Sequence, residues 1–256
     1  MILGFLGTGR ITSSVIEGVF KSNLKIKKIY ISPRNKIIAK KLSKRFKKVT
    51  ISKNNQQLID KSNWVFLAVT PKVGEKILKN LNFKRNQKII SFISSINLTK
   101  LKKIIGNKTK IIRAIPLPPI SLRKGPIPIC PPDKQIKKFF NNLGSTIEIK
   151  NEKSSINFWA TSGMMAPFYE MLKVLSDWLV KKGIKREEAQ NYIVSLFIAL
   201  SEDSSINLKK GMKKLVKDSQ TPGGLNEQAL KQLKKARFYR SLEKSLDSIL
   251  TRLKKV

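Results

Sequence analysis

Hydrophobic positions in the first 150 residues fall into short continuous runs separated by stretches with helical spacing. The runs predict strands at residues 1–6, 28–32, 49–51, 64–69, 88–93 and 110–115. Between them, apolar residues recur every three or four positions and predict helices at 11–19, 34–46, 54–62, 72–78 and 98–105. Strands that alternate with helices favour an α/β fold built on a doubly wound parallel sheet.

The pattern changes near residue 154, where strand-like runs disappear. Helical spacing then predicts helices at 166–182, 186–203, 207–218, 223–235 and 237–254. The first of these carries apolar residues on more than one face, among them Phe168, Leu172 and Trp178. A helix of this kind is buried by its own domain or by a partner. We therefore predict two domains, residues 1–152 with the sheet and residues 153–256 as an all-α dimerisation domain.

Residues 116–132 hold seven of the eleven prolines. Proline fixes φ and removes a hydrogen-bond donor, so the segment is expected to be rigid and extended, as a recognition surface or a stiff connector. Because it leaves the end of a predicted strand, we interpret it as a wall of the active-site cleft. A helix over 133–143 and a strand over 146–150 are predicted to close the first domain.

A glycine turn, "GFLGTGRITSS", separates the first strand from the first helix. Gly7 and Gly9 occupy the first two glycine positions of the dinucleotide motif G-x-G-x-x-G, and Thr12 replaces the third. The larger Thr12 requires a wider helix–strand spacing or a partner for its hydroxyl. The turn is either an ordinary strand–turn–helix or the phosphate site of a Rossmann domain. We favour the Rossmann domain.

The second strand ends in "ISPRN" and lacks the acidic residue that holds the ribose of NAD. Ser32 is expected to cap the next helix, with Pro33 in its first turn. The hydroxyl of Ser32 and the guanidinium of Arg34 suit a 2′-phosphate, which favours NADP (as NADPH). The predicted cofactor-binding residues are Gly7, Thr8, Gly9, Arg10, Ile11, Ser32, Arg34, Asn35, Val69, Thr70 and Pro71.

The chain carries 53 Lys and Arg against 16 Asp and Glu, a net charge of +37. Such a charge attracts polyanions, but the basic residues are spread along the chain and form no known nucleic-acid-binding motif. We expect weak, salt-sensitive binding to nucleic acid and no specific nucleic-acid partner.

The chain has no histidine, so the commonest general base and metal ligand is missing, and no metal site is expected. The single cysteine favours a reducing cytoplasm. The sequence predicts no membrane span and no signal peptide.

A second turn, "SQTPGGLNEQ" at residues 219–228, interrupts the helices of the second half. Gly223 and Gly224 precede a predicted helix start, and unpaired N–H groups there would suit a carboxylate.

These segments together resemble the pyrroline-5-carboxylate reductases, over nearly the whole chain. The opening "GFLGTGRITSSVIEGV", then "WVFLAVTPK", "KIIRAIPLPP", "ATSGMMAPFYEMLKVLSDWLVKKGI" and "TPGGLNEQAL" follow the family's motifs in order. The resemblance implies an NADPH-dependent reduction of pyrroline-5-carboxylate to proline and a homodimer or larger homo-oligomer. It also implies a substrate pocket lined by Ser162, Gly163, Thr221, Gly223, Gly224, Leu225 and Asn226.

The chain departs from the family at four of these places. Thr70 replaces a lysine, Leu117 an asparagine, and Leu225 and Asn226 two threonines. We predict a small cyclic imine acid as substrate, with Asn226 replacing hydroxyl contacts. Hydride addition to a protonated imine needs no nucleophile, metal or histidine, so no catalytic residue is assigned. Two alternatives are another NADP-dependent oxidoreductase and a basic nucleic-acid-binding or scaffold protein.

Overall fold

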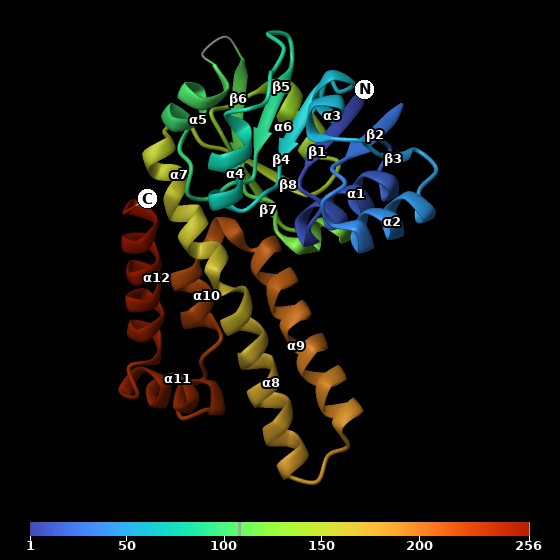
Figure 1. Cartoon of the computed structure of the whole chain (residues 1–256). Helices are drawn as coiled ribbons and strands as arrows, with labels where there is room; N and C mark the ends of the chain where they lie inside the picture. The colour runs from blue at the N-terminus through green and yellow to red at the C-terminus, as the bar shows by residue number, and fades with distance from the viewer. Residues whose placement is uncertain (107–108, 256) are drawn as a thin grey trace. The chain divides into compact units, whose positions relative to one another are not determined.

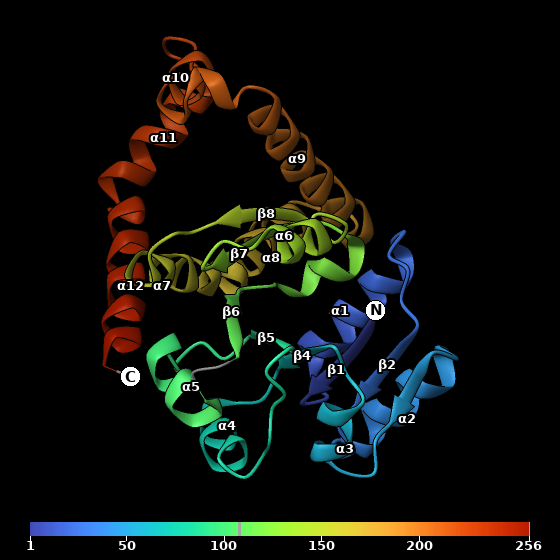
Figure 2. The same cartoon turned by 90° about the horizontal axis from the view of Figure 1, so that it is seen from above.

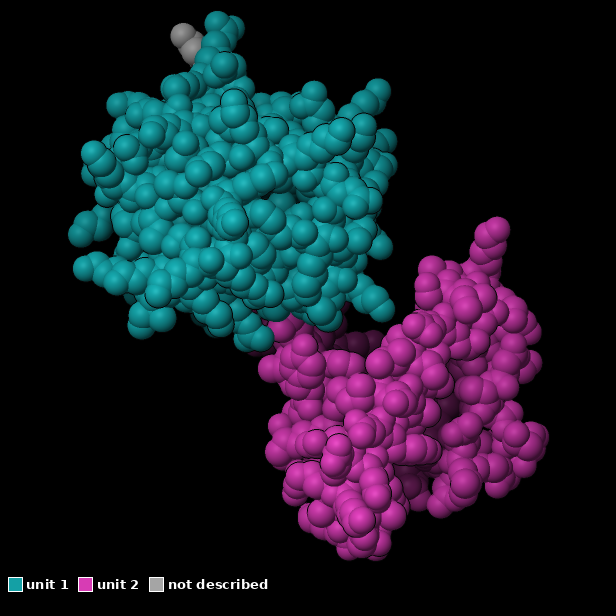
Figure 3. Space-filling view, turned by 90° about the vertical axis from the view of Figure 1, so that its right-hand side faces the viewer, with its two compact units in different colours: residues 1–160, 250–256 teal, residues 161–249 magenta. Residues whose placement is uncertain are grey.

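The computed structural model describes residues 1–106 and 109–255. It contains two compact units, coloured separately in Figure 3. Unit 1 comprises Met1–Ala160 with Leu250–Val256, and unit 2 comprises Thr161–Ile249. The boundary at 152/153 stays a prediction.

Unit 1 is built on one eight-stranded sheet with the order β3-β2-β1-β4-β5-β6-β7-β8. Its strands are β1 (Ile2–Leu6), β2 (Lys28–Ile31), β3 (Val49–Ile51), β4 (Trp64–Leu67), β5 (Lys88–Ser91), β6 (Lys110–Ala114), β7 (Pro126–Cys130) and β8 (Ser145–Glu148). Strands β1 to β6 run parallel, β7 pairs with β6 antiparallel, and β8 pairs with β7 parallel. The predicted doubly wound α/β architecture is confirmed.

Helices cover both faces of this sheet (Figures 1 and 2). They are α1 (Arg10–Lys21), α2 (Lys36–Arg45), α3 (Asn55–Asp60), α4 (Pro71–Leu78), α5 (Leu98–Ile105), the 3₁₀ turn η1 (Pro118–Leu122), α6 (Lys134–Phe140) and α7 (Glu152–Thr161). Trp64 and Phe66 of β4 pack in the core that faces α1, α2 and α6, whereas Val65 and Leu67 pack in the core that faces α3, α4 and α5. This alternation is the period of two expected of a strand, and it buries both faces of the sheet.

Two elements of unit 1 differ from the prediction. The proline-rich segment is not extended throughout, because it contains η1, and its part Pro126–Cys130 is the strand β7 rather than a connector. None of its residues lines the largest groove described below. Residues Glu152–Thr161, for which no element was predicted, form α7.

Unit 2 is helical, as predicted, and its first two long helices pack together. It contains η2 (Ser162–Met164), α8 (Met165–Lys181), α9 (Arg186–Ile206), η3 (Leu208–Lys210), α10 (Met212–Asp218), α11 (Leu225–Lys235) and most of α12 (Phe238–Lys254). The helix predicted at 207–218 is divided, because Gly211 has φ +78° between η3 and α10. No helix of the described residues is long and apolar enough to cross a membrane.

Large apolar side chains remain exposed on α8 and α9 of the single chain. Only Ser176 is buried in α8, while Trp178 is 57% exposed. On α9, Tyr192, Val194 and Ile198 are also exposed. These two helices therefore bury little of their apolar surface within one chain.

Candidate functional site

A groove of about 670 Å³ opens at the carboxyl ends of β1, β2 and β4. In the sheet order, β1 lies between β2 and β4, so successive strands are added on opposite sides of it. Open α/β sheets bind ligands at this switch point. The groove is lined by Leu6, Gly7, Thr8, Gly9, Ser32, Arg34, Asn35, Lys36, Ile37, Asn55, Val69, Thr70, Val73 and Ile77.

The two glycine positions of the β1–α1 turn have different structural explanations. Gly7 has φ +106°, and a Cβ there would collide with the backbone carbonyl of Ala68. Gly9 has an extended conformation, and a Cβ there would meet no other atom within 4 Å. Gly7 is therefore required by the fold, whereas Gly9 leaves open space in front of the α1 N-terminus, where a phosphate can approach the backbone.

The hydroxyls around the turn are bonded internally. Thr12 Oγ1 donates to Gly7 O at 2.7 Å, so the hydroxyl in place of the third glycine has the partner that the sequence required. Ser32 Oγ accepts from Gly7 N at 3.0 Å and lies 3.2 Å from Thr8 Oγ1. These bonds tie the ends of β1 and β2 together.

The prediction that Ser32 caps α2 is wrong. Asn35 is the N-cap, and its Oδ1 accepts from Ile38 N at 3.2 Å. Pro33 therefore lies before the helix and not in its first turn. Ser32 is only 2% exposed, with its hydroxyl engaged by Gly7 and Thr8, so Arg34 and Lys36 are the more accessible polar groups at this end.

The described lining of the groove is positively charged, because it includes Arg34 and Lys36 but no aspartate or glutamate. The first turn of α1 contains no acidic residue, and its N-cap makes no side-chain capping bond. The first N–H groups of that helix lack intrahelical acceptors, and the helix dipole is positive there. The site suits an anionic ligand with phosphates near both β1 and β2.

The groove brings together most of the predicted cofactor residues: Gly7, Thr8, Gly9, Ser32, Arg34, Asn35, Val69 and Thr70. The other three, Arg10, Ile11 and Pro71, begin α1 and α4 and are not part of the lining. Arg10 instead borders a neighbouring hollow with Glu17 and Arg45.

Sequence reasoning missed six residues of the lining: Leu6, Lys36, Ile37, Asn55, Val73 and Ile77. Val73 and Ile77 lie one turn apart on α4, directly after the predicted Val69–Pro71 segment. Their helical spacing was a usable signal. Asn55 begins α3, and nothing in its local sequence points to the groove.

The sequence predicts unpaired backbone N–H groups in the turn before α11, but two of them are hydrogen-bonded. Gly223 N donates to Glu227 Oε2 at 2.8 Å, and Gly224 N donates to Thr221 O at 2.8 Å. These two N–H groups are therefore not free for an external carboxylate. Hydrogen bonds to Lys231 and to the Gly223 N–H lower the pKa of Glu227 and keep this carboxylate charged on the turn.

The two residues that depart from the family's threonine pair lie at the start of α11. Leu225 is 84% exposed, and Asn226 Nδ2 donates to Ser219 O at 3.0 Å. The amide donor of Asn226 thus closes the turn, and its carbonyl oxygen is the remaining polar group on that side chain.

The predicted substrate residues come from two segments of unit 2. Ser162 and Gly163 belong to η2, directly before α8, and the others lie in the turn before α11 or in its first two residues. Figures 1 and 2 show these two segments apart, so one copy of unit 2 does not gather the predicted pocket.

Residues 2–96 match the domain family described as NADP oxidoreductase coenzyme F420-dependent, and residues 155–256 match pyrroline-5-carboxylate reductase dimerisation. Pyrroline-5-carboxylate reductase 2 of Bacillus subtilis is 22% identical, over 92% of this chain and 88% of that protein.

Two solved structures share the fold over the full chain. A 1-pyrroline-5-carboxylate reductase from Streptococcus pyogenes has a TM-score of 0.87 and 23% identity, covering 100% of this chain and 99% of its own. The Plasmodium falciparum pyrroline carboxylate reductase, solved with NADP bound, has a TM-score of 0.85 and 23% identity, covering 100% and 97%.

The fold and the groove define an oxidoreductase of the Rossmann type with a helical second unit. Both domain matches and the relatives over the whole chain then place it more narrowly. These matches support a divergent member of the pyrroline-5-carboxylate reductase family.

Proposed function

We propose that this chain is an NADPH-dependent reductase of a cyclic imine acid, with reduction of pyrroline-5-carboxylate to proline as the leading reaction. The observation that carries the proposal is the groove at the β1/β4 switch point, which has Arg34 and Lys36 at the end of β2 and no acidic residue among its described lining. Family membership supports the same chemistry.

The residues present fit an NADP molecule. The open space at Gly9 and the uncapped first turn of α1 would receive the pyrophosphate. Arg34 and Lys36 would hold the 2′-phosphate by charge-assisted hydrogen bonds. Val69, Val73 and Ile77 supply an apolar wall on the α4 side. When bound, the nicotinamide supplies the hydride.

The substrate half of the proposal rests on unit 2. Its turn before α11 keeps both glycines of the family motif, and Leu225 and Asn226 stand at the start of α11 in place of two threonines. The predicted role of Ser162, Gly163, Thr221, Gly223, Gly224, Leu225 and Asn226 as substrate-binding residues stays a prediction. Because the two segments lie apart in one copy, we propose that two copies together complete the pocket.

Helices α8 and α9 of unit 2 support the proposal of a homodimer or larger homo-oligomer. The exposed apolar side chains of α8 and α9 lie within the 155–256 match to the dimerisation family. A second copy of this surface would bury them, and isologous pairing is the commonest arrangement of soluble oligomers.

The experiment is a substrate panel with the purified chain. Five- and six-membered cyclic imine acids are each offered with NADPH and with NADH, and nucleotide oxidation is followed together with the amino-acid product. We expect reduction with NADPH and a strong preference over NADH. Tight NADPH binding without reduction of any imine acid would favour another NADP-dependent oxidoreductase.

A basic nucleic-acid-binding protein is the alternative of a different class, motivated by the net charge of +37. It predicts sequence- or shape-selective nucleic-acid binding at about 0.15 M salt, without NADPH affinity. The reductase proposal instead expects unselective binding that disappears as the salt concentration rises.

A further inference from the structure

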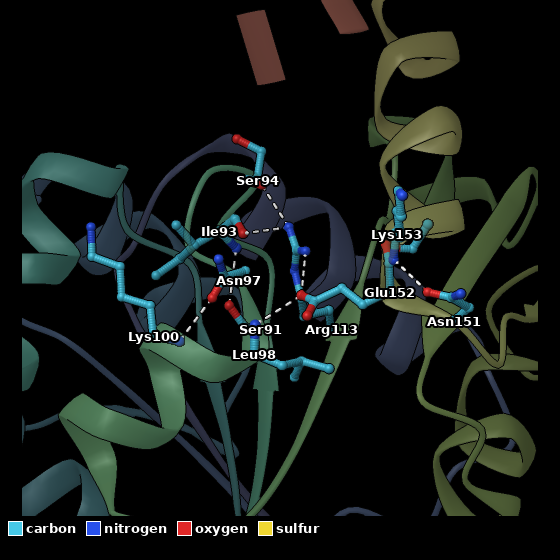
Figure 4. Close-up of polar contacts among 11 residues, drawn as sticks. Ser91, Ile93, Ser94, Asn97, Leu98, Lys100, Arg113, Asn151, Glu152 and Lys153 are labelled. Atoms are coloured by element: carbon cyan, nitrogen blue, oxygen red, sulfur yellow. Dashed lines mark hydrogen bonds and ion pairs between the residues drawn. The ribbon is translucent and has the colours of Figure 1, made fainter. Parts of the chain in front are cut away.

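Arg113 is a buried arginine at the carboxyl end of β6 that the proposed chemistry does not use. It is 2% exposed, and its guanidinium lies 5.5 Å from the ring centre of Trp159. Arg113 Nη1 contacts Glu152 Oε1 at 2.6 Å, and Nη2 donates to Ser94 O at 2.6 Å (Figure 4). Burying a charge is costly unless it is paired and hydrogen-bonded, and this geometry supplies both.

Glu152 extends the same network to the start of α5. Its Oε1 also accepts from Leu98 N at 2.8 Å. The turn between β5 and α5 is therefore held at two points, within the turn through Ser94 O by Arg113 and at the start of α5 through Leu98 N by Glu152 (Figure 4). The two holding groups are bonded to each other, so we call Arg113 and Glu152 together the turn clamp.

The clamp leaves no place for a ligand of its own. Arg113 Nε and Trp159 Nε1 are buried without a hydrogen-bond partner, and the space beside them has no room for a water molecule. Each of these buried donors loses its hydration without gaining a hydrogen bond in return, which is a cost of this arrangement.

The clamped turn touches the wall of the groove. Ile93 and Ile96 of the turn are buried in one core with Val69 and Ile77, which line the groove. A Cβ on Gly74 of α4 would approach the ends of both isoleucines closely, so the turn packs directly under α4. The turn therefore supports Val69 and α4 by direct packing.

This part of the wall lies at one end of the groove. The predicted adenosine end is at Arg34, after β2, whereas Val69 follows β4 and the clamped turn follows the neighbouring β5. A dinucleotide that crosses the switch point from β2 has its reactive end on the β4–β5 side. Small displacements at the reactive end cost far more rate than affinity.

We propose that Arg113 and Glu152 are positioning residues that hold the β5–α5 turn, and through it Val69 and α4, in register with the reactive end of the dinucleotide. The inference rests on the proposed dinucleotide-dependent function. The two residues are not expected to affect binding of the adenosine end of the dinucleotide.

The test compares Glu152→Gln, Glu152→Ala and Arg113→Lys with the parent chain. Both bonds of Glu152 use Oε1, so the glutamine retains an acceptor for Arg113 and Leu98, while alanine removes it. Lysine keeps the charge but cannot reproduce the guanidinium fork to Glu152 and Ser94. Glu148→Ala is the control, because it removes an exposed pair with Lys137 on α6, outside the clamp.

Affinity is measured for NADPH and for adenosine 2′,5′-bisphosphate, which occupies only the adenosine end, alongside kcat, KM and thermal stability. We expect Glu152→Ala and Arg113→Lys to lower kcat about 10-fold and to weaken NADPH several-fold, with bisphosphate affinity unchanged within about twofold. Glu152→Gln should retain at least about half of the parent kcat, and Glu148→Ala should match the parent.

Equal losses for NADPH and the bisphosphate, or a parent-like kcat in both Glu152→Ala and Arg113→Lys, would overturn the inference. If Glu152→Ala does not fold, Arg113→Lys and Glu152→Gln carry the same comparison. A parent that binds NADPH but reduces no imine acid would defeat the proposed substrate, whereas the two binding measurements would still test the clamp.

Discussion

Arg34 leaves the end of β2 on the rim of the groove, with Lys36 nearby and no acidic residue in the described lining. Its guanidinium is the group best placed for a 2′-phosphate, since Ser32 is buried and engaged by Gly7. Arg34→Ala should weaken NADPH at least about 10-fold and NADH less than about twofold, because only NADPH carries that phosphate. Fluorescence titration of both nucleotides measures the difference.

The control for this substitution is Arg85→Ala, which removes another exposed arginine outside the groove lining. It should leave both affinities unchanged, so that loss of general positive charge is separated from loss of the contact. Parallel weakening of NADPH and NADH by Arg34→Ala would contradict the assignment.

Asp133 is a second charged residue with a defined role, and it pairs with lysines at the amino-terminal ends of β5 and β6. It is 5% exposed and accepts from Lys110 at 2.6 Å, Lys88 at 3.2 Å and Ile136 N at 2.8 Å. Burial by itself would raise its pKa, but the bonds from Lys110, Ile136 N and Lys88 outweigh it and lower the pKa from 3.8 to about 2.

A lowered pKa in the folded state means that Asp133 stabilises the fold above pH 3.8 and loses this effect as the pH falls towards 2. Asp133→Asn keeps the α6 cap but not the charge, and should cost about 2 kcal/mol of unfolding free energy at pH 6. The difference from the parent should shrink between about pH 4 and pH 2. Denaturant unfolding at several pH values measures it, and a difference independent of pH would contradict the charge argument.

At the scale of elements, the sequence predicts the helices and strands whose apolar residues follow a simple period. The apolar runs at 64–69 and 88–93 become β4 and β5, and the helix over 98–105 begins and ends as predicted. The sequence also predicts the β1–α1 turn, because Gly7 and Gly9 between a strand and a helix are typical of a tight turn that binds phosphate.

Other elements depend on partners that lie far away in the sequence. Pro126 and Pro128 argue locally against a strand, yet β7 forms between β6 and β8 because Ile127 and Ile129 are buried there. Ser32 was a plausible cap by its position, but its hydroxyl bonds to Gly7, 25 residues away. Such contacts decide a residue's role only after folding, and no local pattern records them.

The turn before α11 is the element where the sequence matches the family motif least. Its own hydrogen bonds suggest a direct test. Asn226 closes the turn on Ser219 and presents its carbonyl, so Asn226→Ala should lower kcat/KM for the imine acid about 10-fold. NADPH affinity should not change. Leu225→Thr should shift preference towards pyrroline-5-carboxylate by restoring a hydroxyl.

Gln228→Ala is the matched control, because it removes an exposed amide two residues further along α11. Steady-state kinetics on the imine panel compares the three variants with the parent. Parent-like kcat/KM in Asn226→Ala would remove Asn226 from the predicted substrate residues.

At the scale of the whole molecule, the chain combines a well-filled core in unit 1 with a helical unit that buries little. Both faces of the sheet carry fully buried side chains such as Phe66 and Leu67. In α9, by contrast, only Ala189 and Ile193 are buried. The positive charge is spread over both units and does not cover this apolar surface.

The exposed side chains of α9 surround the helix rather than forming one stripe: Tyr192, Val194, Leu196, Ile198 and Leu200. A helix that is apolar on all sides is normally enclosed, and a second copy is the occupant that the dimerisation match supplies. We therefore expect the parent to be a dimer or larger at micromolar concentration. Val194→Glu with Ile198→Glu, one helical turn apart, should place two charges in that interface and yield monomers.

Sedimentation velocity or light scattering measures the mass of the parent and the variant over a range of concentrations. The control is Lys40→Glu with Lys44→Glu, which adds two glutamates at the same spacing on exposed positions of α2. The control should keep the parent mass, and the α9 variant should also lose imine reduction if two copies complete the substrate pocket. A parent that is monomeric at all concentrations would contradict both the dimer and the shared pocket. A monomeric α9 variant with full activity would contradict only the shared pocket, because one copy would then hold every group that the reaction requires.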